Sequence, residues 1–395
     1  MILAGLIVLV ILAIWWSTTR KIDFDANATT PLCWRSFFAI SASYLRPARN
    51  PSSAYAEREA AILNRFRALV LEKLGKKKHV CIITSGASES NNLLVRGLPH
   101  RKIFCTPFEH KSLLESVSAE NIMTDRVFSS QDLVSIMGVN NETGDLFGPQ
   151  IAAARGIIHS DISQYFGKLE SPEHPLDLRN VDCFSISLHK LGGPIGVGVL
   201  VLPEALALEL VPQISGTQNN GWRGGTENIS AIEGAIEAIH SAHSNRCAKN
   251  NHLRDLVQYF KKMLGKYFVQ IPQNYFDGLS EQTARAKASA LPADSMMFIR
   301  IPHTDPGINT VLVSFIYAGD ASRRFCNIAF RKRCAEAGVH VSIGSACNTT
   351  RKGASHVLLA LKLPFIVRCG VIRFSFGDSN TRGDIDEFER RIMMV

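Results

Sequence analysis

One lysine of this chain stands where a reactive amine could be built. Residues 185–188 alternate like a short strand, His189 and Lys190 follow, and a Gly-Gly-Pro turn begins one residue later. A lysine fixed in a partly desolvated site loses its proton more readily, and its amine can then form a Schiff base with an aldehyde. Most lysines at turns are simply solvated. Lys190 therefore indicates chemistry only if the rest of the chain supplies partners for it.

Polar side chains also follow other predicted strands. Those that come directly after apolar runs are His110, Asn141, Asp161 and Gln164. In open sheets of parallel strands, ligands bind outside the carboxyl ends of the strands. One polar strand end is ordinary in any α/β protein, but several in succession together with His189 and Lys190 indicate a shared site.

A strand, a glycine turn and a helix start occur together at residues 79–96. The apolar run 79–84 leads into Ser-Gly-Ala-Ser at 85–88, and a helical segment follows. Free N–H groups and the helix dipole make such a helix start suitable for an anion. Many α/β turns contain Gly and Ser, so this motif alone is a weak sign of phosphate binding.

The elements that must position these residues alternate between apolar strands and helix-sized segments. The expected strands are 79–84, 103–106, 133–139, 156–160, 182–187 and 196–202. This alternation predicts a largely parallel sheet covered on both sides by helices. Asn50-Pro51 is expected to open a long helix that ends at Gly75. Residues 278–294 are polar and irregular, and no element is assigned to them.

A composition shift near residues 245–250 begins a smaller α/β domain. Its expected strands are 296–301, 310–315, 339–341 and 371–376, with helices at about 321–337 and from 384. A chain of 395 residues is long enough for two domains.

Composition excludes several classes of protein. With 46% hydrophobic and 20% charged residues, the chain is globular rather than disordered. The net charge of +9 comes from scattered basic residues, so we expect no nucleic-acid partner. The nine cysteines include no C-x-x-C pair, which argues for a reducing compartment and against disulfides or a zinc site.

The first nineteen residues are almost wholly apolar, and Arg20 and Lys21 follow them. Nineteen helical residues would span about 28 Å, against a hydrocarbon core of about 30 Å. A signal peptide is the competing interpretation, but no basic residue precedes the apolar run. We therefore expect a single-pass transmembrane helix at residues 1–19, with the catalytic body facing the cytoplasm.

Nine motifs in order give this chain a family resemblance over about residues 22–388. They are Ala-Thr-Thr-Pro at 28–31, Thr-Ser-Gly-Ala-Ser-Glu-Ser-Asn-Asn at 84–92, Glu-His at 109–110, Val-Asn-Asn-Glu-Thr-Gly at 139–144, Asp-Ile-Ser-Gln at 161–164, Ser-Leu-His-Lys at 187–190, Arg-Gly-Gly-Thr at 223–226, Gly-Ser-Ala-Cys at 344–347 and Ile-Arg-Phe-Ser at 372–375. The chain resembles the cysteine desulfurases of the bacterial sulfur-mobilising type. These are pyridoxal-phosphate enzymes of fold type I and aminotransferase class V.

The resemblance implies pyridoxal 5'-phosphate as cofactor and gives each motif a role toward it. Lys190 would bond to the cofactor's aldehyde, Asp161 would pair with the ring nitrogen, and His110 would stack on the ring. Asn141 and Gln164 would hydrogen-bond the phenolic oxygen and the bound amino acid. The residues expected at the phosphate are Ala87, Ser88, Ser187, His189 and, from a second subunit, Thr226.

The same resemblance implies L-cysteine as substrate. Arg373 would bind its carboxylate with a bidentate fork. Cys347 would be the nucleophile that takes the sulfur as a persulfide and releases alanine. A free cysteine is more often a buried structural thiol, but the small, polar and basic neighbours of Cys347 suit an exposed loop. The loop length resembles that of the long-catalytic-loop subgroup.

The resemblance further implies a homodimer with shared sites and a protein that accepts the sulfur, for iron–sulfur cluster or thio-cofactor assembly. We expect a large cofactor-binding domain at 35–245 and a small domain formed by 20–34 and 246–395. A selenocysteine lyase or another class V enzyme remains an alternative, because its site is much the same. A membrane-tethered scaffold with weak activity is the other alternative, against which the joint presence of Lys190, Asp161, His110 and Cys347 speaks.

Overall fold

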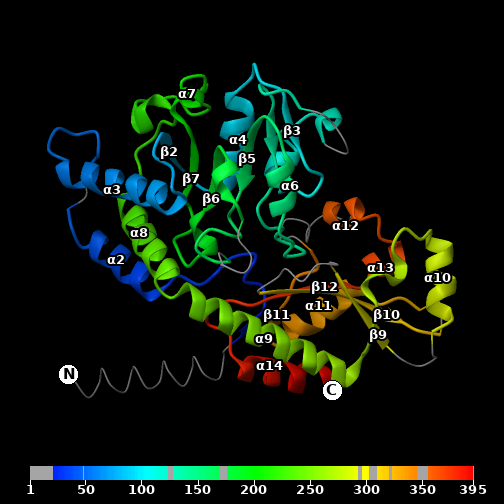
Figure 1. The fold of residues 1–395 in the computed structure, drawn as a ribbon. Helices are drawn as coiled ribbons and strands as arrows, with labels where there is room; N and C mark the ends of the chain where they lie inside the picture. Colours follow the sequence, from blue (N-terminus) through cyan, green and yellow to red (C-terminus); the bar gives the residue numbers. More distant parts are fainter. Residues whose placement is uncertain are drawn as a thin grey trace, which may run out of the picture.

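The computed structural model describes residues 21–47, 49–122, 128–169, 176–291, 296–301, 309–319, 323–344 and 355–394. In this part of the chain, a larger and a smaller β-sheet lie one above the other in the view of Figure 1, with helices packed around both. The candidate site lies where these two units meet.

The larger sheet has six strands in the order β2, β7, β6, β5, β4, β3. Their bounds are β2 (His79–Thr84), β3 (Ile103–Cys105), β4 (Leu133–Ser135), β5 (Ile157–Asp161), β6 (Cys183–Ser187) and β7 (Gly198–Pro203). Strands β3 to β6 pair in parallel, whereas β7 runs antiparallel to both β2 and β6. The expectation of a mainly parallel sheet is confirmed, and β7 is the reversed strand.

Helices cover both faces of this sheet. The alternation along β2 separates the two sides: Cys81 and Ile83 belong to one apolar core, and Ile82 belongs to another. The first core includes α3 (Glu57–Leu74) and α8 (Ile229–Ser244), and the second includes α4 (Ala87–Gly97). The shorter helices of this unit are α5 (Lys111–Leu114), α6 (Gly148–Ala153) and α7 (Glu204–Ala207), with 3₁₀ turns at Ala119–Asn121, Leu178–Asn180, Leu188–Lys190 and Gln218–Gly221.

Helix α2 (Trp34–Tyr44) crosses α8 at a point of very close approach. A Cβ on Gly234 of α8 would lie 2.5 Å from the side chain of Ile40. Only glycine fits at this crossing, because real Cβ atoms do not come so close to another carbon. The crossing attaches the N-terminal part of the chain to the larger unit.

The smaller unit contains a four-stranded sheet in the order β12, β10, β9, β8 and a parallel pair, β1 with β11. Their bounds are β1 (Ile22–Asp23), β8 (Val269–Ile271), β9 (Met296–Ile301), β10 (Thr310–Tyr317), β11 (Val339–His340) and β12 (Val371–Ser375). The helices are α9 (Arg246–Tyr267), α10 (Glu281–Ser289), α11 (Asn327–Glu336), α12 (His356–Ala360), α13 (Phe365–Arg368) and α14 (Arg382–Phe388), with a 3₁₀ turn at Gln273–Phe276 and a π-helical turn at Glu389–Met393.

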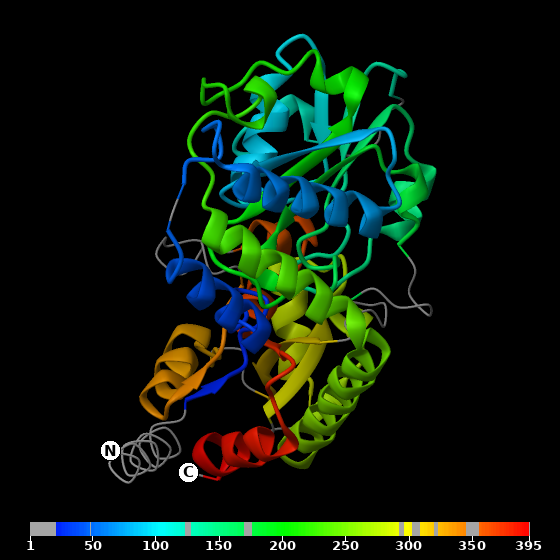
Figure 2. The same cartoon turned by 90° about the vertical axis from the view of Figure 1, so that its left-hand side faces the viewer.

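Phenylalanine rings hold the N-terminal strand against this smaller unit. The buried ring of Phe24 contacts Phe260 of α9, Phe374 of β12 and Phe388 of α14. The centroids of Phe260 and Phe374 are 4.6 Å apart. Figures 1 and 2 show α9 running from the end of α8 along the smaller unit, so one long helix joins the two.

The structure contradicts the transmembrane part of the fold prediction. No helix among the described residues is long and apolar enough to cross a membrane. The predicted anchor at 1–19 lies outside the described residues. An apolar run of that length would only just match a hydrocarbon core of about 30 Å, so apolar composition was weak support for a span. We therefore withdraw the transmembrane helix from the predicted fold class, whose α/β part stands, and withdraw the single-pass membrane localisation.

Two local predictions also differ from the structure. The helix expected from Asn50-Pro51 begins only at Glu57, because the Asn50 side chain accepts a hydrogen bond from the Ser52 N–H at 3.0 Å and starts a turn instead. Residues 278–294, to which the sequence assigned no element, contain α10.

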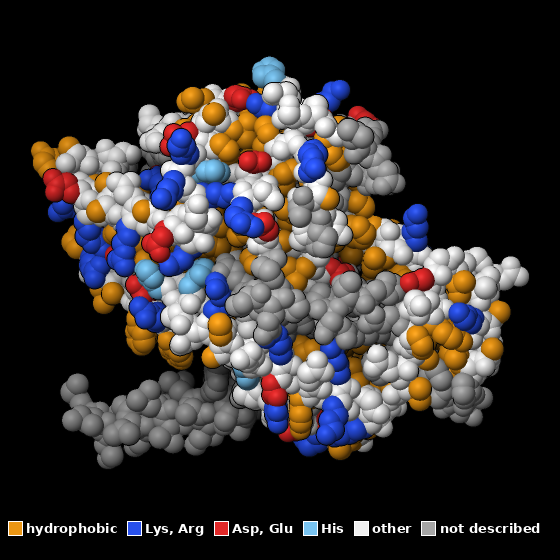
Figure 3. Space-filling model, viewed as in Figure 1, with side chains coloured by type: hydrophobic (Ala, Val, Ile, Leu, Met, Phe, Trp, Pro, Cys, Tyr) orange, Lys and Arg blue, Asp and Glu red, His pale blue; other side chains and the backbone are white. Residues whose placement is uncertain are grey.

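On the face drawn in Figure 3, Lys and Arg side chains are interspersed with Asp and Glu side chains.

Candidate active site

A cavity of about 250 Å³ lies at the carboxyl ends of β5 and β6. Ten of the residues that the sequence predicts for the site line it: Ala87, Ser88, His110, Asn141, Asp161, Gln164, Ser187, His189, Lys190 and Arg373. Parallel strands that end at one edge bring these residues together from distant parts of the chain. Arg373 reaches the same cavity from the smaller unit.

Lys190 ends the single turn that follows β6. The turn is held tightly, because a Cβ on Gly193 would lie 2.7 Å from the carbonyl oxygen of Leu188. The Lys190 ammonium donates hydrogen bonds to the carbonyl oxygens of Asn27, at 2.6 Å, and Ala28, at 2.7 Å. The amine therefore faces the cavity from a rigid base and is held beside the N-terminal segment.

Asp161 is the last residue of β5 and is buried. Its Oδ1 accepts a hydrogen bond from the Ser163 N–H at 3.0 Å, and its Oδ2 accepts one from Asn91 Nδ2 at 3.1 Å. These two hydrogen bonds fix the orientation of the carboxyl group. The cavity thus has a fixed anionic acceptor at its base.

His110 is the N-cap residue of α5, and its neutral ring lines the cavity. Its Nδ1 accepts a hydrogen bond from the Ser112 N–H at 3.2 Å, which leaves the proton of a neutral ring on Nε2. Burial lowers the pKa of His110. A neutral imidazole at this position can stack on an aromatic ligand and exchange protons through Nε2.

The N-terminus of α4 closes another side of the cavity. Its first turn leaves N–H groups without helical acceptors, and the Ala87 N–H donates to Ser187 Oγ at 2.8 Å. His189 Nδ1 lies 2.9 Å from Thr29 Oγ1. Burial, with Lys190 nearby, lowers the pKa of His189 to about 4, so this ring is neutral at pH 7. Helix dipole, hydroxyl groups and an imidazole together suit a phosphate.

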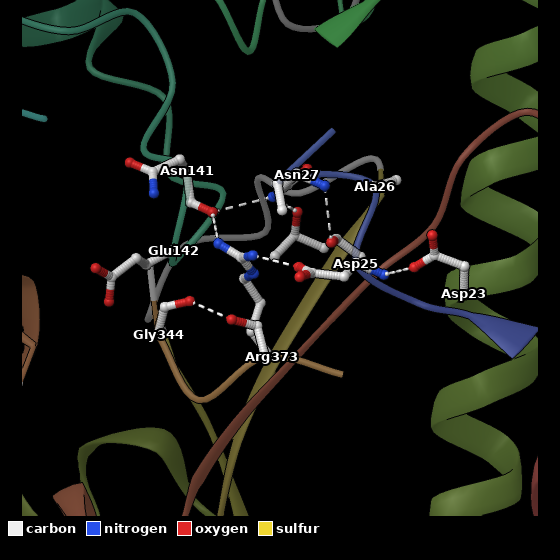
Figure 4. A network of polar contacts seen from close by, with 12 residues as sticks. Asp23, Asp25, Ala26, Asn27, Asn141, Glu142, Gly344 and Arg373 are labelled. Atoms are coloured by element: carbon white, nitrogen blue, oxygen red, sulfur yellow. Dashed lines mark hydrogen bonds and ion pairs between the residues drawn. The ribbon is translucent and has the colours of Figure 1, made fainter. Parts of the chain in front are cut away.

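Arg373 faces this cluster from the middle of β12, and its side chain is 1% exposed. Its Nη1 donates to the carbonyl oxygen of Asn141 at 2.7 Å, and its Nη2 donates to Asp25 Oδ1 (Figure 4). The Arg373 Nε has no hydrogen-bond partner among the described residues. A buried guanidinium whose Nε has no protein acceptor, on a side chain that lines the cavity, is suited to an anionic ligand.

Two predicted residues are not among those that line the cavity. Thr226 is exposed and lies outside the cavity of its own chain. Cys347 lies outside the described residues, and so does the segment on which the long-loop prediction rests. The described residue Ser355 donates a hydrogen bond from its hydroxyl to Glu142, the neighbour of Asn141.

Five residues that line the cavity are absent from the predicted set: Asn27, Ala28, Met137, Val139 and Ser163. Asn27 connects several of the predicted residues. Its carbonyl oxygen accepts from Lys190 and from Gln164 Nε2, and its Oδ1 accepts from Lys168 at 2.9 Å. A polar residue directly before the Ala-Thr-Thr-Pro motif was the signal that could have found it.

The residues present fit pyridoxal phosphate. An amine, an anionic acceptor fixed by two hydrogen bonds, a neutral imidazole and a helix N-terminus line one cavity. These groups match the aldehyde, the ring nitrogen, the ring face and the phosphate of that cofactor. The unpaired Nε of Arg373 adds a donor for a substrate carboxylate.

The fold and the site define the class of the protein. The family model for aminotransferase class V matches residues 117–270. The fold is similar to that of a NifS-like protein from Rickettsia africae ESF-5, with a TM-score of 0.76 and 24% identity over 95% of this chain and 100% of that chain. The chain is thus a class V fold type I protein, and its cofactor is pyridoxal 5'-phosphate.

Comparison with characterised relatives narrows the class to one family. The chain is 30% identical to the mitochondrial cysteine desulfurase of Drosophila melanogaster over 93% of this chain and 79% of that protein. It is 29% identical to the cysteine desulfurase IscS of Dictyoglomus turgidum over 93% of this chain and 92% of that protein. The chain belongs to the cysteine desulfurase family, and this favours the desulfurase over the lyase, aminotransferase and scaffold alternatives.

Proposed function

We propose that this cavity is the active site of a pyridoxal-phosphate-dependent cysteine desulfurase that converts L-cysteine to L-alanine and retains the sulfur. The observation that carries the proposal is the placement of Lys190, Asp161 and the start of α4 around one cavity, which Arg373 also lines from the smaller unit. Those groups can hold the cofactor and an amino-acid carboxylate at the same time.

Each part of the cofactor has residues that would hold it. Lys190 is the amine for the aldehyde, Asp161 pairs with the ring nitrogen, and His110 covers the ring. Asn141 and Gln164 hydrogen-bond the phenolic oxygen and the substrate. The phosphate is bound by Ala87, Ser88, Ser187 and His189. The bound cofactor supplies an electron sink for bond changes at the amino acid.

The chain's own groups bind and orient L-cysteine and move its protons. Arg373 binds the carboxylate, and the Asn141 carbonyl and Asp25 keep the guanidinium in place. Lys190 and His110 Nε2 are the groups that can take and return protons within the cavity. Burial of Asp161 and Arg373 limits the access of water to the charged groups.

Cys347 is the proposed nucleophile. As a thiolate, Cys347 Sγ attacks the sulfur of bound L-cysteine; the carbon–sulfur bond breaks, and a sulfur–sulfur bond forms. A proton takes the place of the sulfur on the substrate carbon, which yields alanine and a Cys347 persulfide. The terminal sulfur then passes to an acceptor protein of iron–sulfur cluster or thio-cofactor assembly.

A homodimer completes the proposal. Thr226 is exposed and lies outside its own cavity, which supports a role at the phosphate of a second subunit. The aromatic residues Trp34 and Phe38 of α2 are 76% and 64% exposed. Large apolar side chains grouped on a surface are typical of an interface. Sedimentation analysis tests this arrangement, and a monomer at the concentrations at which the enzyme is active would contradict it.

We also propose the division into a large domain at 35–245 and a small domain formed by 20–34 and 246–395. The pairing of β1 with β11 supports it, because this contact joins the first part of the chain to the C-terminal unit.

The decisive experiment incubates the purified protein with L-cysteine and pyridoxal phosphate and measures alanine and sulfide. We expect both products from the wild type, and a loss of alanine in Cys347→Ala. Absence of alanine from the wild type, or undiminished alanine from Cys347→Ala, would contradict the proposal. Cys326→Ala, at an exposed cysteine, is the matched control and should keep full activity.

A further inference from the structure

The register of two strands places an acidic side chain beside Arg373. Asp25 forms a parallel β-bridge with Ser375, and Arg373 lies two residues before Ser375 on β12. Side chains two residues apart on a strand point to the same face, so Asp25 and Arg373 share a face across the strand pair. Figure 4 shows the two side chains in contact, with Asn141 on the other side of the guanidinium.

Asp25 is itself fixed by the backbone. Its N–H donates to Asp23 Oδ1 at 2.9 Å, and the next residues continue into Asn27, whose N–H donates to Ser375 Oγ at 3.0 Å. A carboxylate on an ordered strand can therefore hold its partner in one orientation. This differs from a pair on the surface, where both side chains move freely.

The hydrogen bonds of Arg373 show which edge of the guanidinium remains for a ligand. Its Nη2 contacts Asp25, its Nη1 contacts the carbonyl oxygen of Asn141, and its Nε has no partner among the described residues. An unpaired N–H on a side chain that is 1% exposed is energetically unfavourable unless a ligand accepts from it. Asp25 and Asn141 thus bind two of the three nitrogens, and the third has no acceptor on a side chain that lines the cavity.

We propose that Asp25 is a positioning residue for substrate binding: together with the carbonyl of Asn141, it orients Arg373 so that the Nε edge meets the carboxylate of the amino acid. This inference rests on the proposed function. Asp25 also balances the charge of the buried guanidinium before the substrate binds, so that the carboxylate enters a site where Arg373 is already oriented.

A purely structural role for Asp25 would have a different consequence. If Asp25 only neutralised Arg373 to maintain the fold, its removal would weaken the binding of every ligand alike. If Asp25 orients Arg373 for a carboxylate, its removal weakens only the ligands that carry one. L-cysteine and cysteamine, which has the same amine and thiol but no carboxylate, distinguish the two roles.

The experiment titrates the cofactor-loaded enzyme with each ligand and follows the absorbance of the cofactor. For Asp25→Ala we expect the Kd of L-cysteine to rise about tenfold to a hundredfold, the range for a hydrogen bond between charged groups, and that of cysteamine to stay within about twofold. Asp25→Asn keeps the oxygen that accepts from Nη2, so it should recover most of the L-cysteine affinity. Asp255→Asn is the control, because Asp255 is a carboxylate that also pairs with an arginine, Arg382, but does not line the cavity.

Equal weakening for both ligands, or an unchanged Kd for L-cysteine, would overturn the inference. Should Asp25→Ala fail to fold, Asp25→Ser supplies the same comparison with a polar side chain too short to hold the guanidinium.

In an Arg373→Lys background, Asp25→Ala should add little to the L-cysteine Kd, and a full additional effect would also contradict the inference. Wild-type protein that forms no alanine would overturn the proposed function, whereas an active wild type with an unaltered Asp25→Ala overturns this inference alone.

Discussion

Two cations line the cavity, one on the wall formed by the larger unit and one on the wall formed by the smaller unit, and the structure holds them in different ways. Lys190 stands on a turn after β6 of the large sheet, and its ammonium contacts the carbonyl oxygens of Asn27 and Ala28. Arg373 stands in the middle of β12 of the smaller sheet, where it contacts the carboxylate of Asp25. A carbonyl oxygen holds an ammonium without a full opposite charge, whereas a carboxylate fixes a guanidinium in one charged orientation.

The difference matches the two tasks. A reactive amine must give up its proton and change partners, and lysine suits this because its charge is compact and its stem is flexible. A carboxylate-binding group must keep its charge and its direction, and arginine suits this because its fork is planar and remains protonated. The two walls therefore differ in the chemistry of the groups that hold each cation, and four experiments test this difference.

The largest effect is expected for Lys190→Ala. It removes the amine that bonds to the cofactor, and we expect a loss of activity on the order of a thousandfold or more. The absorbance of the covalently bound cofactor should disappear in a spectrum of the purified protein. Lys168→Ala changes a neighbouring lysine and should retain that absorbance. A spectrum unchanged by Lys190→Ala would contradict the role of this lysine.

Arg373→Lys tests whether the second cation acts through its fork or only through its charge. Lysine keeps the charge but loses the planar donors, so we expect the KM for L-cysteine to rise by about tenfold to a hundredfold with a smaller change in kcat. Steady-state kinetics on L-cysteine measure both constants. A KM close to that of the wild type would show that a point charge is enough, and the contrast between the two walls would fail.

Lys168 is close enough to both cations for their charges to affect its pKa. Burial, followed by the charges of Lys190 and Arg373, lowers its pKa to about 7 from an ordinary value of 10.5. Between those values the unfolded state binds a proton that the folded state lacks, so the free energy of unfolding should rise with pH, by at most about 1.4 kcal/mol per pH unit. Below pH 7 both states are protonated, and this slope disappears.

Urea unfolding from pH 7 to 10 measures the slope, which should flatten in Lys168→Met. Lys262→Met, at an exposed lysine, is the control and should keep the wild-type slope. If Lys168→Met left the slope unchanged, Lys168 would not be the group that titrates.

Glu109, the neighbour of His110, gives a pH effect of the opposite sign. Burial raises its pKa to about 8 from 4.5, although Thr106 Oγ1 and the Met137 N–H donate to its Oε1. The folded state binds the extra proton in this window, so the contribution of Glu109 to stability is full below pH 4.5 and is lost as pH rises through 8. Glu109→Gln should remove this loss in urea unfolding between pH 5 and 8. A falling stability that persists in Glu109→Gln would assign the effect to another group.

The sequence predicted where the strands lie along the chain and which residues stand at their carboxyl ends, because the apolar pattern and the motifs are local. Three of these residues follow apolar runs that are visible in the sequence: His110, Asp161 and Lys190. The same reasoning failed where tertiary contacts decide. The reversed direction of β7 comes from its pairing with both β2 and β6, and no pattern within 198–203 records that direction.

The first nineteen residues show a related limit. Their composition indicates an affinity for apolar surroundings, but composition alone does not establish that a segment crosses a membrane. The described part of the structure contains no helix suited to a span.

The reactive groups of the site can be read from the sequence: an amine after β6, a carboxylate at the end of β5, a helix start after β2 and an arginine in the last strand. The groups that hold them become visible only in the folded structure. Asp25 lies 348 positions before Arg373, and Asn27 lies 163 positions before Lys190. Such contacts arise from the pairing of strands and the meeting of two sheets, and local sequence patterns carry no information about either.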